Sequence, residues 1–448
     1  MNPCSLGPLF LACVFAADVR PPDRHGVEKR RDLIVRVYEQ GRPVSVMLGC
    51  DRSTDPQAPL RSFVKLPPPT DDKGQEIPRT IGRGAGVIIH SQGYLLTNAH
   101  VVRGAHGVEV TLADGSSAPA DVLAMDESRD VALLRLDLGR PLPAATLGLP
   151  GDVLVGESVV AIGNPDGLAF SGAAGRVAGL NRISLVDGGV RITGLIQLDL
   201  AGNPGCSGGP IFNALGEVVG LNQSVKLGWN SFTFAVSTSE LRRWLPSALQ
   251  AEARVGAAAG WSLEDRRDDA SDARVVSVRP DGPAAAAGVQ SGDVIERVGA
   301  RVIDTVADVE LAWLDVERGK PVEVEVVRPN ARLVLKLVVP GPAAEPAPRV
   351  LARAGLQVAP LDAAALQAWG WRGRRAMALA AADGAFFPEG PKPEVGDLLA
   401  RVAGESPGDL AHLDALLASR KAGDKLTVTL LRRVEGKPVR LDATLVLK

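Results

Sequence analysis

Short apolar segments separated by glycine, proline or Asp-Gly turns run through the first half of this 448-residue chain. The clearest lie at 86–89, 108–112, 159–162 and 217–221. Many short strands joined by tight turns are typical of all-β barrels and sandwiches. The region from about 31 to 249 is therefore predicted to be an all-β domain. A helix closes it, with Ser239 as the candidate N-cap.

A serine surrounded by glycines lies between two of these segments, in the sequence NPGCSGG at 203–209. Upstream, His100 follows one strand-like segment and Asp130 precedes another. A serine hydroxyl is a weak nucleophile until an imidazole accepts its proton, and a carboxylate orients that imidazole. The order His100, Asp130, Ser207 is that of the chymotrypsin triad. Glycines beside the serine let backbone N–H groups turn toward a developing oxyanion. These features together predict nucleophilic acyl transfer.

The composition is that of a globular protein with several domains, since 46% of the residues are hydrophobic and 23% are charged. The net charge of −2 gives no reason to expect nucleic acid or an anionic membrane as a partner. No cluster of His, Cys and Asp has the spacing of a metal site, and no phosphate-binding glycine loop opens a helix. Neither a metal nor a cofactor is therefore expected.

The N-terminal segment has the pattern of an export signal. Residues 5–17 carry no charge and are too few to span a bilayer as a helix. Residues 1–16 are predicted to be a signal peptide, which implies export to the periplasm or cell envelope. Two of the four cysteines fall in this leader. The other two, Cys50 and Cys206, are too few for a disulfide framework, and whether they pair stays open at this point.

The second half of the chain contains an internal repeat. The segment at 290–295, with the sequence QSGDVI, is echoed at 394–399 by EVGDLL. A proline-rich linker at 341–348 separates the two copies. The repeat predicts two related modules of about a hundred residues each, at 251–339 and 349–448.

These motifs together resemble those of the HtrA/Deg serine endopeptidases, in which a trypsin-like domain is followed by PDZ domains. The resemblance covers nearly everything from about residue 31 to the end. It implies a mainly β protein: a chymotrypsin-like double β-barrel at 31–249 and two small α+β PDZ-like domains, the second divergent. Two positions differ from the family, which usually has asparagine at the place of Cys206 and proline at the place of Ser237.

The resemblance also assigns the site residues. It places Asp130 rather than Asp126 in the triad with His100 and Ser207, and the strand that follows Asp130 favours the same choice. The backbone N–H groups of Gly205, Cys206 and Ser207 are the candidate oxyanion hole.

The family's layout makes Gln223, Ser224 and Val225 one wall of the substrate pocket, with Asp199 facing away from it. A preference for Val, Ala, Ile or Leu at P1 is therefore expected.

A PDZ domain holds a peptide carboxylate with the N–H groups of a glycine-containing loop and adds the peptide to its sheet as a strand. The candidate loop of the third block contains Gly355 and Leu356. Its equivalent in the second block lies near 256–261, where the sequence fits the family pattern poorly.

The resemblance implies an ATP-independent serine endopeptidase of the cell envelope that cleaves unfolded or damaged proteins. Its PDZ domains would bind peptide C-termini, and the chain would form a homo-oligomer, a trimer or a multiple of one. Tyr38 is the only aromatic candidate for the contacts that often build such trimers.

One alternative function is a catalytically silent PDZ scaffold or holdase chaperone, against which the complete triad argues. Another is an esterase-like hydrolase, which the all-β pattern disfavours. The histidines outside the triad are expected at the surface or in loops: His25, His90, His106 and His412.

Overall fold

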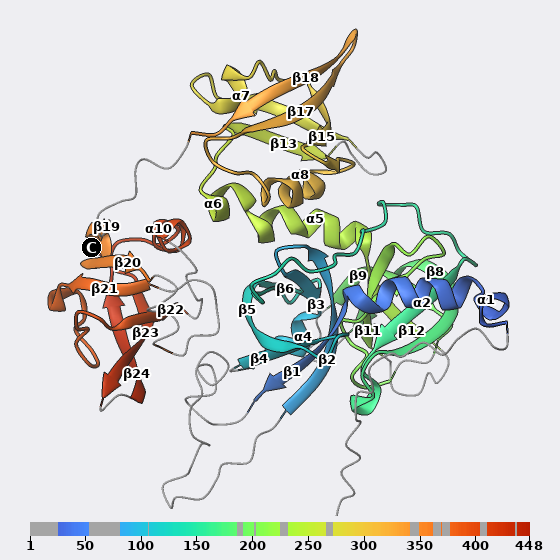
Figure 1. The fold of residues 1–448 in the computed structure, drawn as a ribbon, viewed down its shortest axis with the longest axis horizontal. Coiled ribbons are helices and arrows are strands. Elements are labelled where there is room, and N and C mark those ends of the chain that lie inside the picture. Colours follow the sequence, from blue (N-terminus) through green and yellow to red (C-terminus); the bar gives the residue numbers. More distant parts are fainter. Residues whose placement is uncertain are drawn as a thin grey trace, which may run out of the picture.

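The computed structural model describes residues 26–52, 81–105, 107–185, 191–200, 203–224, 232–265, 272–340, 349–361, 369, 377–403, 410–434 and 437–448. Within these residues the strands form two closed barrels followed by two six-stranded sheets (Figure 1). The prediction of a mainly β fold with a double barrel and two smaller α+β modules is confirmed. The predicted signal peptide lies outside the described residues. None of the described helices is long and apolar enough to cross a membrane.

The first barrel has the strand order β1-β2-β3-β6-β5-β4. Its strands are β1 (Ser45–Asp51), β2 (Ile81–His90), β3 (Tyr94–Thr97), β4 (Gly107–Leu112), β5 (Ser117–Asp126) and β6 (Val131–Leu136). Leu48, Ile88 and Leu134 belong to one of its buried apolar clusters. The short helix α4 (Ala99–Val102) follows β3 and carries His100.

The second barrel has the strand order β10-β11-β12-β9-β8-β7. Its strands are β7 (Ser158–Gly163), β8 (Ser171–Leu185), β9 (Arg191–Leu198), β10 (Pro210–Phe212), β11 (Val218–Ser224) and β12 (Thr233–Ser237). The serine loop leads into β10 and is tied to the first barrel, because the Ala85 N–H donates to the Ser207 carbonyl at 2.9 Å. The two barrels thus meet at the serine.

Two helices, α1 (Val27–Arg30) and α2 (Leu33–Gly41), precede the barrels. The 3-10 turns η1 (Arg42–Val44) and η2 (Pro165–Gly167) lie between strands or helices. On α2, the Tyr38 hydroxyl donates to the Phe170 carbonyl at 2.6 Å. Tyr38 therefore makes a contact within its own chain.

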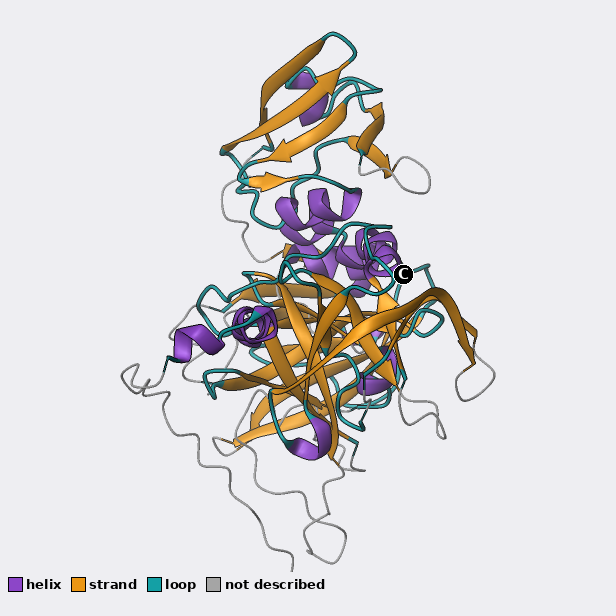
Figure 2. Ribbon diagram, turned by 90° about the vertical axis from the view of Figure 1, so that its right-hand side faces the viewer, coloured by secondary structure: helices purple, strands orange, loops and turns teal. Residues whose placement is uncertain are grey.

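A layer of helices lies between the strands of the barrels and the sheet of the first module: α5 (Thr238–Leu249), α6 (Ala251–Val255) and α8 (Val306–Trp313) (Figure 2). The predicted closing helix is present as α5, but its N-cap is Ser237, whose Oγ accepts from the Glu240 N–H at 3.4 Å. The expectation of Ser239 as cap was wrong by two residues, because the helix begins at Thr238. Ser239 instead accepts from the Gly151 N–H.

Polar contacts of buried side chains join the first module to the barrels. Arg242 of α5 is 3% exposed and pairs with Asp308 of α8 at 2.6 Å. His90, at the end of β2, is 1% exposed, and its Nε2 lies 3.1 Å from Oδ2 of Asp315. The expectation of a surface or loop position for His90 was wrong, because His90 belongs to β2 and the module covers it. His25 and His106 lie outside the described residues, as does the side chain of His412.

The first module contains β13 (Trp261–Asp265), β14 (Ala273–Val278), α7 (Pro283–Ala286), β15 (Val294–Val298), β16 (Arg301–Val302), α8, β17 (Pro321–Arg328) and β18 (Ala331–Val338). The second contains β19 (Arg349–Leu351), η4 (Ala352–Ala354), β20 (Leu356–Pro360), β21 (Met377–Ala382), η5 (Gly384–Phe386), β22 (Leu398–Val402), α10 (Leu410–Ala418), β23 (Lys425–Val434) and β24 (Lys437–Val446). In Figure 1 the two modules occupy separate positions beside the barrels.

The internal repeat extends to matched side-chain contacts. The first module's Asp293 is 1% exposed and accepts from Arg328 and from the N–H of Gln290. In the second module Asp397 is 2% exposed, and it accepts in the same way from Arg432 and from the Glu394 N–H. A buried carboxylate needs such partners, so the two modules use the same device to hold the same turn.

Candidate active site

His100 and Asp130 are joined through both carboxylate oxygens. Nδ1 of His100 lies 2.8 Å from Oδ2 of Asp130 and 3.0 Å from Oδ1, and the His100 backbone N–H donates to Oδ1 at 3.0 Å. Asp130 is 4% exposed and has φ of 56°, a left-handed conformation that aspartate tolerates better than most residues. Its carbonyl accepts from the Asn98 side chain at 2.9 Å. The His100 N–H and the Asn98 side chain thus hold Asp130 in place, and its carboxylate orients the imidazole.

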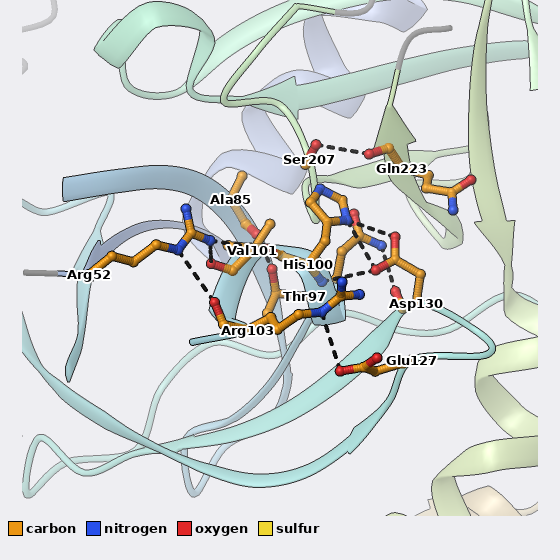
Figure 3. Close-up of polar contacts among 11 residues, drawn as sticks. Arg52, Ala85, Thr97, His100, Val101, Arg103, Glu127, Asp130, Ser207 and Gln223 are labelled. Atoms are coloured by element: carbon orange, nitrogen blue, oxygen red, sulfur yellow. Dashed lines mark hydrogen bonds and ion pairs between the residues drawn. The ribbon is translucent and has the colours of Figure 1, made fainter. Parts of the chain in front are cut away.

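Ser207 lies on the other side of the imidazole ring (Figure 3). Its Oγ donates to the Gln223 carbonyl of β11 at 2.8 Å. The next residue, Gly208, has φ of 81°, and a Cβ there would lie 2.1 Å from the Thr97 hydroxyl oxygen. Only glycine fits at this close approach of the two barrels.

The three candidate oxyanion donors are not equivalent. The Cys206 N–H donates to the Asn203 carbonyl at 3.1 Å, within the loop itself. Gly205 has φ of 92°, and a Cβ there would lie 2.2 Å from the Asn164 carbonyl oxygen. The N–H groups of Gly205 and Ser207 are therefore the better candidates for oxyanion donors, because the Cys206 N–H is already used in a hydrogen bond within the loop.

Both described cysteines are free thiols. Cys50 lies on β1 in the wall of the first barrel, and burial raises the pKa of its thiol to about 11. Burial also raises the pKa of Cys206. Each thiol is thereby held in its neutral form at neutral pH, which is the poorer nucleophile. The open question of a Cys50–Cys206 bridge is answered by the free thiols.

The predicted pocket wall is only partly described. Gln223 is 2% exposed and lies on β11 beside the serine. Ser224 ends that strand, while its side chain and the whole of Val225 lie outside the described residues. Asp199 is exposed and its Oδ1 accepts from the Arg176 N–H. Its carboxylate is therefore engaged by the backbone of β8, and its orientation away from the pocket stays a prediction.

Arg52 is a contributor that the sequence analysis did not identify. Its guanidinium donates to the carbonyls of His100 at 3.0 Å and Val101 at 2.7 Å, at the end of α4 (Figure 3). These carbonyls have no partner within so short a helix, and a cation at that end is favourable. No local motif marks this residue, because it lies 48 positions before His100.

The two candidate carboxylate loops differ. In the first module, the Ala259 N–H donates to Oε1 of Glu252 at 3.1 Å, just before the edge strand β13. Burial raises the pKa of Glu252, while the bond from Ala259, the charge of Arg279 and a hydrogen bond with the Trp261 side chain oppose this shift. In the second module Gly355 has φ of 59° and precedes β20, which begins at Leu356. There β19 pairs with β20.

No group of three or more His, Cys, Asp or Glu side chains in the described part of the chain has the geometry of a metal site.

Comparison with known proteins identifies two regions. A family model described as a trypsin-like peptidase domain matches residues 84–221, and one described as a PDZ domain matches 257–339. The chain is 31% identical over 356 residues to a protein of Synechocystis named as the putative serine protease HhoB, covering 70% of this chain and 80% of that protein. It is 34% identical over 327 residues to a protein of Halomonas elongata named as a DegP-like periplasmic serine endoprotease, covering 66% of each chain.

The chain spans two thirds or less of the length of such DegP-like relatives, with 61% for one from Pseudomonas savastanoi. Among solved structures, the HtrA-type protease AlgW with a decapeptide aligns over 68% of this chain and 97% of its own, at 25% identity and a TM-score of 0.39.

Proposed function

The chain belongs to the HtrA/Deg family of serine proteases, and we propose that it is a serine endopeptidase that cleaves unfolded or damaged proteins in the periplasm or cell envelope. The single observation that carries the proposal is the His100–Asp130 pair with Ser207 on the other side of the imidazole. The relatives named as periplasmic serine endoproteases support the same activity and location.

In the proposed mechanism the Ser207 hydroxyl leaves the Gln223 carbonyl and turns toward Nε2 of His100. His100 accepts the proton as Oγ attacks the scissile carbonyl, and later gives it to the leaving amine. Asp130 holds Nδ1 protonated and stabilises the imidazolium. The N–H groups of Gly205 and Ser207 bind the oxyanion, and each such donor is worth about 3–4 kcal/mol in comparable sites.

Replacing the nucleophile tests the activity. Ser207→Ala is expected to lower casein cleavage by at least about 10⁴-fold, because removal of one triad member disables the unit. The melting temperature is expected to change little, since the hydroxyl makes one hydrogen bond to a backbone carbonyl. Cleavage is followed by release of labelled peptides from unfolded casein.

Ser171→Ala is the matched control. Its hydroxyl also donates to a backbone carbonyl, that of Leu168 at 2.7 Å, but lies outside the site. Full activity is expected for this variant. Equal casein cleavage by Ser207→Ala and the wild type would contradict the mechanism, and no cleavage by either protein would favour a silent scaffold or holdase. Cut sites mapped in the same digest are expected to follow Val, Ala, Ile or Leu, because we expect Asp199, which accepts from the Arg176 N–H of β8, to face away from the pocket.

We further propose that the PDZ-like modules recognise the C-termini of substrates and that the chain forms a homo-oligomer, a trimer or a multiple of one. Two observations in the first module support recognition: its loop binds a carboxylate, that of Glu252, and β13 ends the sheet formed by the described residues. A peptide that adds a strand there gains mostly main-chain contacts, so we expect micromolar affinity, or a binding free energy of about −8 kcal/mol.

Exposed apolar side chains on the second barrel support the proposed assembly into an oligomer, with Leu154 66% and Leu215 76% exposed.

Glu252 gives a direct test of carboxylate recognition. In the Ser207→Ala background, Glu252→Ala is expected to strengthen binding of an apolar peptide with a free C-terminus by about 5-fold or more, since the Ala259 N–H no longer has an internal partner. The amidated peptide is expected to bind both proteins equally. Fluorescence anisotropy of the labelled peptides measures both affinities.

Glu264→Ala is the control, because this exposed carboxylate lies on β13 itself. It is expected to leave the difference between the two peptides unchanged. If the free and amidated peptides bind alike in every variant, carboxylate capture by this loop is wrong.

A further inference from the structure

The two modules differ at the strand that would receive a peptide. In the first module β13 ends the sheet as the structure describes it, and its only strand partner there is β14. In the second module the corresponding strand, β20, pairs with β21 on one side and with β19 on the other. The edge that is open in one repeat is therefore covered in the other.

The covering strand has the geometry of a ligand that adds to a sheet edge. β19 runs antiparallel to β20, and Leu351 and Leu356 form the register pair nearest the turn. Its C-terminal end runs into the turn at 352–355, which contains the left-handed Gly355. An extended peptide bound with its last residue at the glycine-containing loop would run in the same direction along the same edge.

The last residue of β19 also occupies an apolar site. Leu351 is 7% exposed and belongs to the core of the second module. That core includes Leu356 of β20 and Leu413 and Leu417 of α10. Burial of a leucine side chain contributes roughly 2 kcal/mol, so this side chain helps to hold β19 on the sheet.

We infer that residues 349–351 are an intramolecular ligand of the second module, which closes its peptide-docking edge and leaves the first module as the one that receives substrate C-termini. This inference rests on the proposed peptide recognition by the modules. It assigns that recognition to one of them and names the segment of the chain that blocks the other.

The expected size of the block follows from effective concentration. A segment joined to its site by a short connection competes at about millimolar effective concentration. If the segment by itself binds the edge with a Kd of about 1–10 μM, it lowers the apparent affinity of a free peptide by about 100- to 1000-fold. A free C-terminus would therefore leave the wild-type second module unoccupied at micromolar concentrations.

The test uses hydrogen–deuterium exchange of the full-length Ser207→Ala protein, read at the amides of β20. Leu351→Asp is expected to speed this exchange by about 10-fold or more, since a charge cannot stay in the apolar site. A peptide ending in Val-Leu with a free carboxylate is expected to slow the exchange again in this variant and to have no effect on β20 of the parent. Val334→Asp, which also introduces an aspartate but at a 57% exposed position on β18 of the first module, is the control and is expected to match the parent.

Exchange at β23 and β24 shows whether the module stays folded. If Leu351→Asp also exposes these strands, Val350→Pro replaces it, because proline disrupts the pairing of β19 through the backbone alone. Unchanged β20 exchange in a folded variant would overturn the inference, as would peptide protection of β20 in the parent. Neither result depends on proteolysis, and peptide binding that responds to Glu252→Ala would still support recognition by the first module.

Discussion

At the scale of single residues, the two aspartates of the segment DESRD have different tasks. Asp130 faces His100, whereas Asp126 holds the turn before it. Oδ1 of Asp126 accepts from the Ser128 N–H at 2.9 Å and the Arg129 N–H at 3.1 Å, and Oδ2 pairs with the Arg129 guanidinium at 2.6 Å. The Asp130 carboxylate therefore orients the imidazole of His100, and the Asp126 carboxylate stabilises the turn that holds Asp130 in position.

Asparagine at each position separates these tasks. Asp130→Asn is expected to lower kcat by about 10⁴-fold with little loss of stability, because asparagine tolerates positive φ but no longer fixes the productive tautomer of His100. Asp126→Asn is expected to lower kcat by less than about 10-fold. Steady-state kinetics on a chromogenic peptide and thermal melting measure both effects, and a larger kcat loss for Asp126→Asn would reverse the assignment.

At the scale of elements, α5 joins the barrels to the first module through one arginine. The Arg242 guanidinium donates to the carbonyls of Leu147 and Gly148 at the barrel and to Thr305 and Asp308 at the N-terminus of α8. Thr305 and Asp308 form the capping box of that helix. The same side chain thus supports the cap of α8 and its docking on α5.

Removing this arginine is expected to be costly. Arg242→Ala leaves the Asp308 carboxylate buried without its cation, a change that typically costs about 3–5 kcal/mol. The neighbouring Arg243 has a 61% exposed side chain and pairs with Glu240, so Arg243→Ala is expected to cost at most about 1 kcal/mol. Thermal melts in the Ser207→Ala background compare the two, and equal losses would show that the buried pair does not hold the interface.

At the scale of the whole molecule, the junction of α6 and α8 makes stability depend on pH. Oε2 of Glu310 on α8 accepts from the Ala251 N–H at the start of α6 at 2.6 Å. Burial raises the pKa of Glu310 to about 7 from 4.5, and the charge of Glu252 adds to the rise. Between these two pH values the folded chain keeps a proton that the unfolded chain has lost. The free energy of unfolding therefore falls as pH rises through this window, by up to about 3 kcal/mol.

Glu310→Gln keeps a hydrogen-bond acceptor and removes the charge. It is expected to raise the melting temperature at about pH 8, change it little at about pH 4.5, and flatten its dependence on pH between them. Melting curves across this range measure the effect. A Glu310→Gln protein whose stability falls with pH as steeply as the parent's would exclude Glu310 as the cause.

The sequence by itself determined the features that local patterns encode. Short apolar segments with turn residues predicted the barrels, and the glycines around Ser207 with the order of His100 and Asp130 predicted the site. The repeat predicted two modules, because each copy keeps the aspartate that holds its turn. These signals are local, since a strand, a tight turn or a repeated motif is written in consecutive residues.

Only the tertiary structure decided how distant segments meet. Arg52 reaches the carbonyl of His100 from 48 positions upstream, and His90 is buried by a module that begins more than 150 residues later. Glu252 occupies a loop N–H, and β19 covers an edge that its repeat leaves open. No local pattern predicts such contacts, because burial and pairing depend on which surfaces the folded chain brings together.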